Sequence, residues 1–93
     1  MNKGELIDAI TKKANLTKKD VELIVGATFD VIVDAVAEGN KVTLVGFGSF
    51  EPRARAAREG RNPKTREKML IPATVVPVFS AGKQFKEAVA KPE

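Results

Sequence analysis

The sequence predicts an α+β fold in which a helical body carries a three-stranded antiparallel sheet that extends into a β-ribbon arm. Three observations support this prediction. Apolar residues recur at helical spacing over the first 40 residues and again near the C-terminus. Between these segments, short runs of β-branched and aromatic residues alternate with turns that contain glycine or proline. A basic segment, residues 53–68, contains no Val, Ile, Leu or Phe and therefore cannot belong to a core.

The composition limits the functions that the chain could have. A chain of 93 residues is expected to form a single domain, 1–93, that buries only about 60–65% of its unfolded surface. The sequence has no Cys and no His, which removes the commonest nucleophile–base pairs and metal ligands. We therefore predict no enzyme activity, no catalytic residues, no metal, no cofactor and no small-molecule substrate. No apolar run approaches the ~20 residues of a membrane helix, and no signal-peptide pattern follows Met1, so we expect a cytoplasmic protein.

A first amphipathic helix of about three turns is indicated by Leu6, Ile7 and Ile10, which fall on one helical face. The pair Asn15-Leu16 breaks it. Thr17 and Asp20 then have the spacing of a capping box, which places a second helix from Lys18 to about Glu38. Its end is expected at Gly39-Asn40, where glycine permits a left-handed cap.

The second helix carries more apolar residues than one buried face requires. A face that includes Phe29, Ile32 and Val36 needs a cover besides the first helix. The sheet of the same chain could provide it, and a second copy of the chain is the other candidate. Because the domain is so small, we favour a homodimer.

The strands follow from short alternating segments. Residues 41–45 form the first strand, Gly46-Phe47-Gly48 a turn, and a second strand continues from Ser49 through Pro52 into the arm. Ser80 is expected to cap a closing helix that runs to about Ala90, with Gln84 completing the cap. The expected parts are a helical dimerisation part (1–40), a body sheet (41–52 and 74–79), an arm (53–73) and a C-terminal helix (80–93).

The basic segment holds seven cationic side chains against two acidic ones, which is more positive charge than the +4 of the whole chain. Gly60, Asn62 and Pro63 lie in its middle and favour a turn. Arg53 and Arg55 share a strand face, and a bulge or turn is expected before Arg58 because it leaves this alternation. A solvated basic loop is the simpler alternative, but the strand-like flanks favour a projecting ribbon.

Arginine forms paired hydrogen bonds with phosphate and enters narrow minor grooves, so the arm suits a polyanionic duplex. It contains no aromatic residue, whereas surfaces that bind single strands stack bases on aromatic rings. Duplex DNA is therefore the expected partner. Pro63 could be a wedge that enters a base step or could simply stiffen the turn, and its spacing does not decide between the two.

Three segments carry a resemblance to a known family: residues 45–50 (VGFGSF), 60–65 (GRNPKT) and 79–83 (FSAGK). Over essentially its full length the chain resembles the HU/IHF family of bacterial architectural DNA-binding proteins, and within it the homodimeric HU members. The resemblance implies an intertwined dimer at the bacterial nucleoid, with Pro63 as the intercalating residue; this family is itself a standard example of wedge insertion into the minor groove. The implied DNA-binding residues are Arg53, Arg55, Arg58, Arg61, Asn62, Pro63, Lys64, Thr65 and Arg66 in the arm, and Lys3, Lys83 and Lys86 on the body. The predicted dimer core consists of Phe29, Ile32, Val36, Phe47 and Phe50.

Two positions depart from the family pattern. Arg66 stands where many relatives carry glycine, which adds charge near the tip. Gly26 lies where a polar or acidic residue is frequent, so an ion pair between Lys3 and this position is not expected.

Two rival functions remain at this point. A site-specific bender of the IHF type would share the fold, but the chain has no helix suited to reading bases. A basic membrane-surface protein is the rival of another class, although the arm lacks the apolar face that membrane binding requires. We therefore expect a DNA-binding protein with little sequence preference that bends duplex DNA and does not bind membranes.

Overall fold

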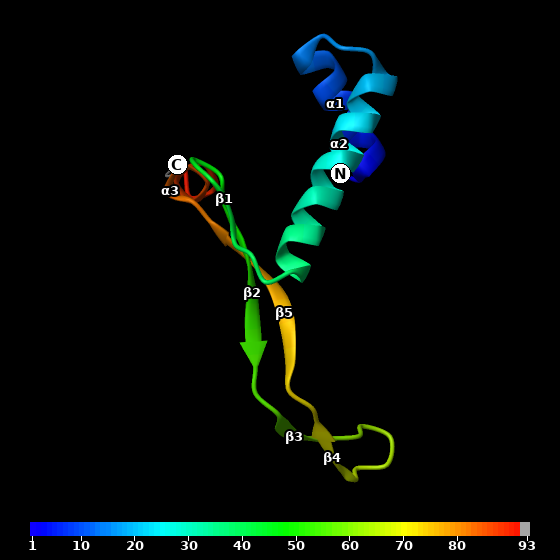
Figure 1. Ribbon diagram of the computed structural model, residues 1–93, viewed down its shortest axis with the longest axis vertical. Coiled ribbons are helices and arrows are strands. Elements are labelled where there is room, and N and C mark those ends of the chain that lie inside the picture. Colours follow the sequence, from blue (N-terminus) through cyan, green and yellow to red (C-terminus); the bar gives the residue numbers. More distant parts are fainter. Residues whose placement is uncertain (92–93) are drawn as a thin grey trace. The chain divides into compact units, whose positions relative to one another are not determined.

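The computed structural model describes residues 1–91 and confirms the α+β class (Figure 1). The chain forms two compact units, residues 1–34 and the part from Ala35 onward. None of the helices in the described part of the chain has the length and apolarity needed to cross a membrane. The elements are α1 (Lys3–Ala14), α2 (Lys18–Ala37), β1 (Val42–Leu44), β2 (Gly48–Arg55), β3 (Arg58–Arg61), β4 (Lys68–Ile71), β5 (Thr74–Ala81) and α3 (Lys83–Val89).

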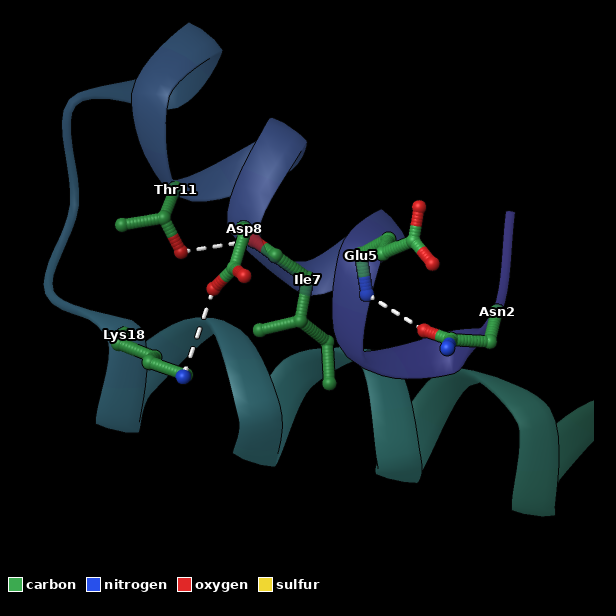
Figure 2. A network of polar contacts seen from close by, with 6 residues as sticks. All are labelled: Asn2, Glu5, Ile7, Asp8, Thr11 and Lys18. Atoms are coloured by element: carbon green, nitrogen blue, oxygen red, sulfur yellow. Dashed lines mark hydrogen bonds and ion pairs between the residues drawn. The ribbon is translucent and has the colours of Figure 1, made fainter.

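The ends of α1 and α2 are fixed by local hydrogen bonds. The side chain of Asn2 accepts a hydrogen bond of 2.9 Å from the Glu5 N–H and starts α1 (Figure 2). Asn15 ends α1 in the left-handed region at φ 56°. Thr17 Oγ1 accepts a hydrogen bond of 3.2 Å from the Asp20 N–H, so the predicted cap of α2 is confirmed.

The predicted glycine stop of α2 is also confirmed. Gly39 adopts φ 93°, and its N–H donates to the Val36 carbonyl at 3.0 Å. The Asn40 N–H donates to the Ala35 carbonyl at 2.9 Å. This pair of bonds forms a Schellman motif, which satisfies carbonyls that the helix end would otherwise leave free.

The buried core of the described chain is very small. Ile7, Val21 and Val25 are buried, and Ile10 packs against them. Across the turn between α1 and α2, Asp8 and Lys18 form an ion pair of 3.4 Å (Figure 2). The apolar excess predicted for α2 is left exposed in the single chain: 43% of Phe29, 66% of Leu23 and 66% of Val31 remain accessible, among others.

The body sheet is antiparallel with the strand order β1-β2-β5. Gly46 turns the chain between β1 and β2 at φ 84°, and the Phe47 N–H donates to the Leu44 carbonyl at 2.9 Å. Four aromatic rings pack around this end of the sheet, with centroid separations of 5.5, 5.3, 4.8 and 6.1 Å between the pairs Phe47–Phe79, Phe47–Phe85, Phe50–Phe79 and Phe79–Phe85. Such tilted pairs are favourable because ring edges meet ring faces.

The expected start of the closing helix is wrong. Ser80 does not cap it but lies in β5, paired with Ser49, and α3 begins at Lys83 without a side-chain cap. Strand pairing continues past the expected end at Phe79, because the Gly82 N–H still donates to the Phe47 carbonyl at 2.8 Å. The helix is therefore shorter than predicted, and the predicted capping role of Gln84 is also wrong. The last two residues of the expected segment 80–93 lie outside the described residues.

The backbone around Gly48 leaves no room for a side chain. A Cβ there would lie 2.5 Å from the Ser80 carbonyl oxygen and 2.7 Å from the Phe79 ring. We therefore expect Gly48→Ala to lower the free energy of unfolding by about 1–3 kcal/mol, the usual cost of overpacking. Gly26 in α2 is the matched control: a Cβ there meets nothing within 4 Å, so Gly26→Ala should raise stability by about 0.5–1 kcal/mol. Urea unfolding followed by circular dichroism measures both, and wild-type stability in Gly48→Ala would contradict the packing described.

Candidate nucleic-acid interface

The arm begins where β1 ends its pairing with β2. The last pair between them is Val42 with Phe50, so beyond that point β2 keeps only β5 as a neighbour. Pro52 lies opposite Pro77 just outside this point. Neither residue can donate a ladder hydrogen bond, which a ribbon with free edges tolerates. The second strand continues through Pro52 into the arm, as predicted, and stays paired with β5 as far as Arg55.

The ribbon keeps one register along its whole length. Arg55 pairs with Thr74 at the end of β2, and Arg58 pairs with Ile71 at the start of β3. Residues 56–57 and 72–73 between these pairs are unpaired, two on each strand. The expected irregularity is therefore present. It is not a bulge, because both strands have the same number of unpaired residues. Pro72 contributes to the interruption because it has no N–H to donate.

The interruption opens a hollow of about 640 Å³ between the strands. Arg55 and Arg58 line it from one strand, with Ile71, Pro72 and Thr74 on the other. Figure 1 shows β2 beside β5, with β3 and β4, which also pair with each other, nearer the tip. Two arginine residues thus contribute to the lining of one concave surface, and arginine is a residue that binds anionic groups.

The tip is a turn closed by its own backbone. The Asn62 N–H donates to the Glu67 carbonyl at 3.0 Å, and the Arg66 N–H donates to the Asn62 carbonyl at 2.7 Å. The Asn62 side chain accepts a further bond of 2.9 Å from the Lys64 N–H. Pro63 sits inside this closed turn and is exposed, so its ring faces solvent in the single chain.

Arg66 adopts the left-handed conformation with φ 58°. A residue with a Cβ is strained there, whereas glycine is not. The departure noted in the sequence thus has a structural counterpart: the turn requires a positive φ at position 66, where the family resemblance leads us to expect glycine.

The cations of the arm are almost all free of internal partners. Among residues 1–91, Arg53 alone of the seven basic side chains of the arm forms an ion pair, which joins its Nη2 to Glu51 Oε1 at 2.8 Å. The carboxylate of Glu51 was not singled out by the sequence reasoning, although its spacing of two from Arg53 was a visible signal. The six remaining cations are Arg55, Arg58, Arg61, Lys64, Arg66 and Lys68.

The basic residues predicted on the body lie outside the arm. Lys83 and Lys86 are on α3, where Lys83 is 89% exposed in its side chain and lies 4.0 Å from Glu87. Lys3 begins α1 in the other unit. The structure therefore gathers Arg53 to Arg66 in one arm and leaves the three lysines on two helices, Lys3 on α1 and the other two on α3.

Comparisons with known proteins agree on one family. The family model described as "Bacterial DNA-binding protein" matches residues 1–90. The DNA-binding protein HU of Nostoc sp. is 63% identical over 93 residues, which is 100% of this chain and 99% of that protein. HU of Geobacillus stearothermophilus is 55% identical over 89 residues, covering 96% and 99%. Among solved structures, an HU–DNA cocrystal structure from Anabaena matches with a TM-score of 0.95 and 64% identity over 99% of this chain and 100% of that chain. A mutant of Thermotoga maritima HU matches with a TM-score of 0.72 and 42% identity, covering 96% and 99%.

Replacing the strained residue at the tip tests the turn. We expect Arg66→Gly to stabilise the closed turn locally by about 1 kcal/mol, because glycine adopts φ 58° without strain. Amide hydrogen exchange of Asn62 and Arg66, whose N–H groups close the turn, should slow accordingly. Lys64→Gly removes the same charge and is not in the left-handed region, so it should speed exchange. Faster exchange in Arg66→Gly would contradict the strain.

Proposed function

The chain belongs to the family of bacterial DNA-binding proteins, and from this premise we propose that it is an HU-like architectural protein that binds duplex DNA and bends it. The observation that carries the proposal is the continuous ribbon whose cations, with one exception, have no internal partner among the described residues. A two-stranded ribbon fits a groove of the duplex, and unpaired cations bind phosphate by releasing its condensed counterions.

We assign the DNA contacts to the arm and to three lysines of the body. Arg53, Arg55, Arg58 and Arg61 would follow the minor groove, because guanidinium groups are favoured where that groove is narrow. Asn62, Lys64, Thr65 and Arg66 would hold the backbone around the tip, and Lys3, Lys83 and Lys86 would bind phosphates beside the body. Pro63 would enter a base step as the wedge, a role known for this family.

Little sequence preference is expected of this arrangement. Among the described residues, no helix is suited to reading base edges, and backbone contacts position a protein without carrying sequence information. The relatives compared above are HU proteins, which disfavours a site-specific bender of the IHF type. The membrane-surface alternative has no specific observation in its favour. A protein that coats DNA belongs with the chromosome, so we place it at the bacterial nucleoid in the cytoplasm and assign it no catalytic role.

The functional unit that we propose is a homodimer. Of its hydrophobic residues, the described chain buries only Ile7, Val21 and Val25, while Phe29, Phe47 and Phe79 remain 43%, 45% and 40% exposed. Exposed apolar surface of this kind marks an interface. A second copy would also supply a second arm, so that two ribbons could bind one duplex. It would cover the predicted core residues Phe29, Ile32, Val36, Phe47 and Phe50.

The electrostatic part of the proposal predicts a steep dependence on salt. Each neutralised phosphate contributes about −0.9 to the slope of log K against log salt, so Arg58→Ala should flatten the slope by up to about 0.9. It should also weaken unrelated duplex sequences about equally. Fluorescence anisotropy with several duplexes measures both effects, and Lys13→Ala on α1 serves as the control that leaves the slope unchanged. A loss confined to one sequence would disprove binding without sequence preference.

The wedge role of Pro63 predicts a change in bending. We expect Pro63→Ala to reduce the bend angle and narrow the preference for nicked over intact duplex, because nicked DNA opens at lower cost. Weak non-specific binding should survive, since the cations remain. Energy transfer between dyes at the ends of a short duplex, at saturating protein, reports the angle. Pro77→Ala, at the base of the ribbon, is the matched control. If the angle is unchanged in Pro63→Ala, the proline only stiffens the turn.

A further inference from the structure

Glu51 lies between two cations at the base of the arm. Its Oε1 accepts a hydrogen bond of 2.8 Å from Arg53 Nη2, and its Oε2 lies 3.9 Å from Lys41 Nζ. The side chain of Glu51 is 28% exposed, against 48% for Arg53 and 58% for Lys41. One carboxylate thus holds two positive side chains at the point where the three-stranded sheet becomes a ribbon.

The register of the sheet explains this grouping. Glu51 and Arg53 are two residues apart on β2 and therefore share a face. Val42 pairs with Phe50, so one step further along the antiparallel pair Lys41 stands opposite Glu51. The backbone therefore brings the three residues together at the end of the paired segment.

The acidic residues inside the basic segment are not paired in this way. Glu59 and Glu67 have no cation within 4.0 Å among the described residues. Arg53 is the one cation of that segment that is already neutralised by a carboxylate within residues 1–91.

We propose that Glu51 is an internal competitor of phosphate, which lowers the affinity of the arm base for DNA. Lys41 is then a further DNA contact, in addition to those assigned above, and like the contact of Arg53 it depends on release from Glu51. The inference rests on the proposed function. A phosphate beside Arg53 must either displace the carboxylate or remain next to a like charge. Exposed ion pairs are weak, so the pair opens readily, and its opening subtracts from the free energy of binding.

The competitor has a recognisable effect on salt dependence. A cation that is neutralised by Glu51 displaces fewer condensed counterions when it meets DNA. In Glu51→Gln, Arg53 and Lys41 should each add a full phosphate contact, and each contact steepens the slope of log K against log salt by up to about 0.9. If Glu51 instead orients Arg53 for phosphate, the same substitution weakens binding. The two roles therefore predict opposite signs.

The test compares the wild-type chain, Glu51→Gln and Glu59→Gln on one short intact duplex across a series of KCl concentrations. Glu59→Gln makes the same change of charge in the arm without releasing a cation of the described chain. We expect Glu51→Gln to bind severalfold more tightly at low salt with a steeper slope, and Glu59→Gln to change the slope less. In an Arg53→Ala background, the gain from Glu51→Gln should shrink, as expected for directly coupled residues. Thermal melting verifies that each variant is folded.

The possible outcomes distinguish a failure of the competitor role from a failure of the proposed DNA binding. The competitor role is overturned if Glu51→Gln binds the duplex no more tightly than the wild-type chain, or if Glu59→Gln changes the slope of log K against log salt as much as Glu51→Gln does. Either result leaves DNA binding itself intact. A wild-type chain that binds no duplex would overturn the proposed function and this inference together.

Discussion

The shortage of buried apolar surface is the constraint on which the rest of the structure depends. Within residues 1–91, the only hydrophobic residues that a single chain buries are Ile7, Val21 and Val25, although 43% of its residues are hydrophobic. Burying a large apolar side chain stabilises a fold by about 1.5–3 kcal/mol, so the exposed residues of α2 and of the aromatic cluster represent a large unrealised gain. A second copy is the simplest source of that cover, and a small domain commonly needs one. Dimerisation is thus part of folding in this account.

The arm differs from the helices and the body sheet in what its strands carry. Its strands carry no aromatic residue and none of their hydrophobic residues is buried, so the arm gains little from packing and forms a ribbon with the register of the sheet. The fixed register sets which charges meet: continued by one residue, it places Lys41 opposite Glu51, and it puts Arg55 and Arg58 along one side of the same hollow. In the proposed function, the affinity for DNA then depends on which cations of the arm have no carboxylate partner. The geometry of the tip determines which part of the duplex Pro63 can contact.

The features that the sequence predicted well are governed by neighbours in the chain. The Thr17 cap and the Gly39 stop depend on residues within one turn, and both are observed. The start of the last helix was predicted wrongly because the pairing of Ser80 with Ser49 is non-local and overrides the capping preference of serine. Two other features also depend on strand register, which the order of residues along the chain does not reveal. They are the unpaired stretch that contains Pro72 and the ion pair between Glu51 and Lys41. The positive φ of Arg66 could not be predicted from the sequence, because it depends on the backbone conformation of the whole tip turn.

Sedimentation equilibrium combined with thermal unfolding over a range of protein concentrations tests the central claim most directly. If a second copy completes the core, the protein at micromolar concentration has twice the chain mass of 10.0 kDa, and its unfolding temperature rises with concentration. Phe29→Ser, which places a polar group on the exposed face of α2, should lower both the association and the unfolding temperature. A folded monomer at micromolar concentration, with an unfolding temperature independent of concentration, would contradict the account.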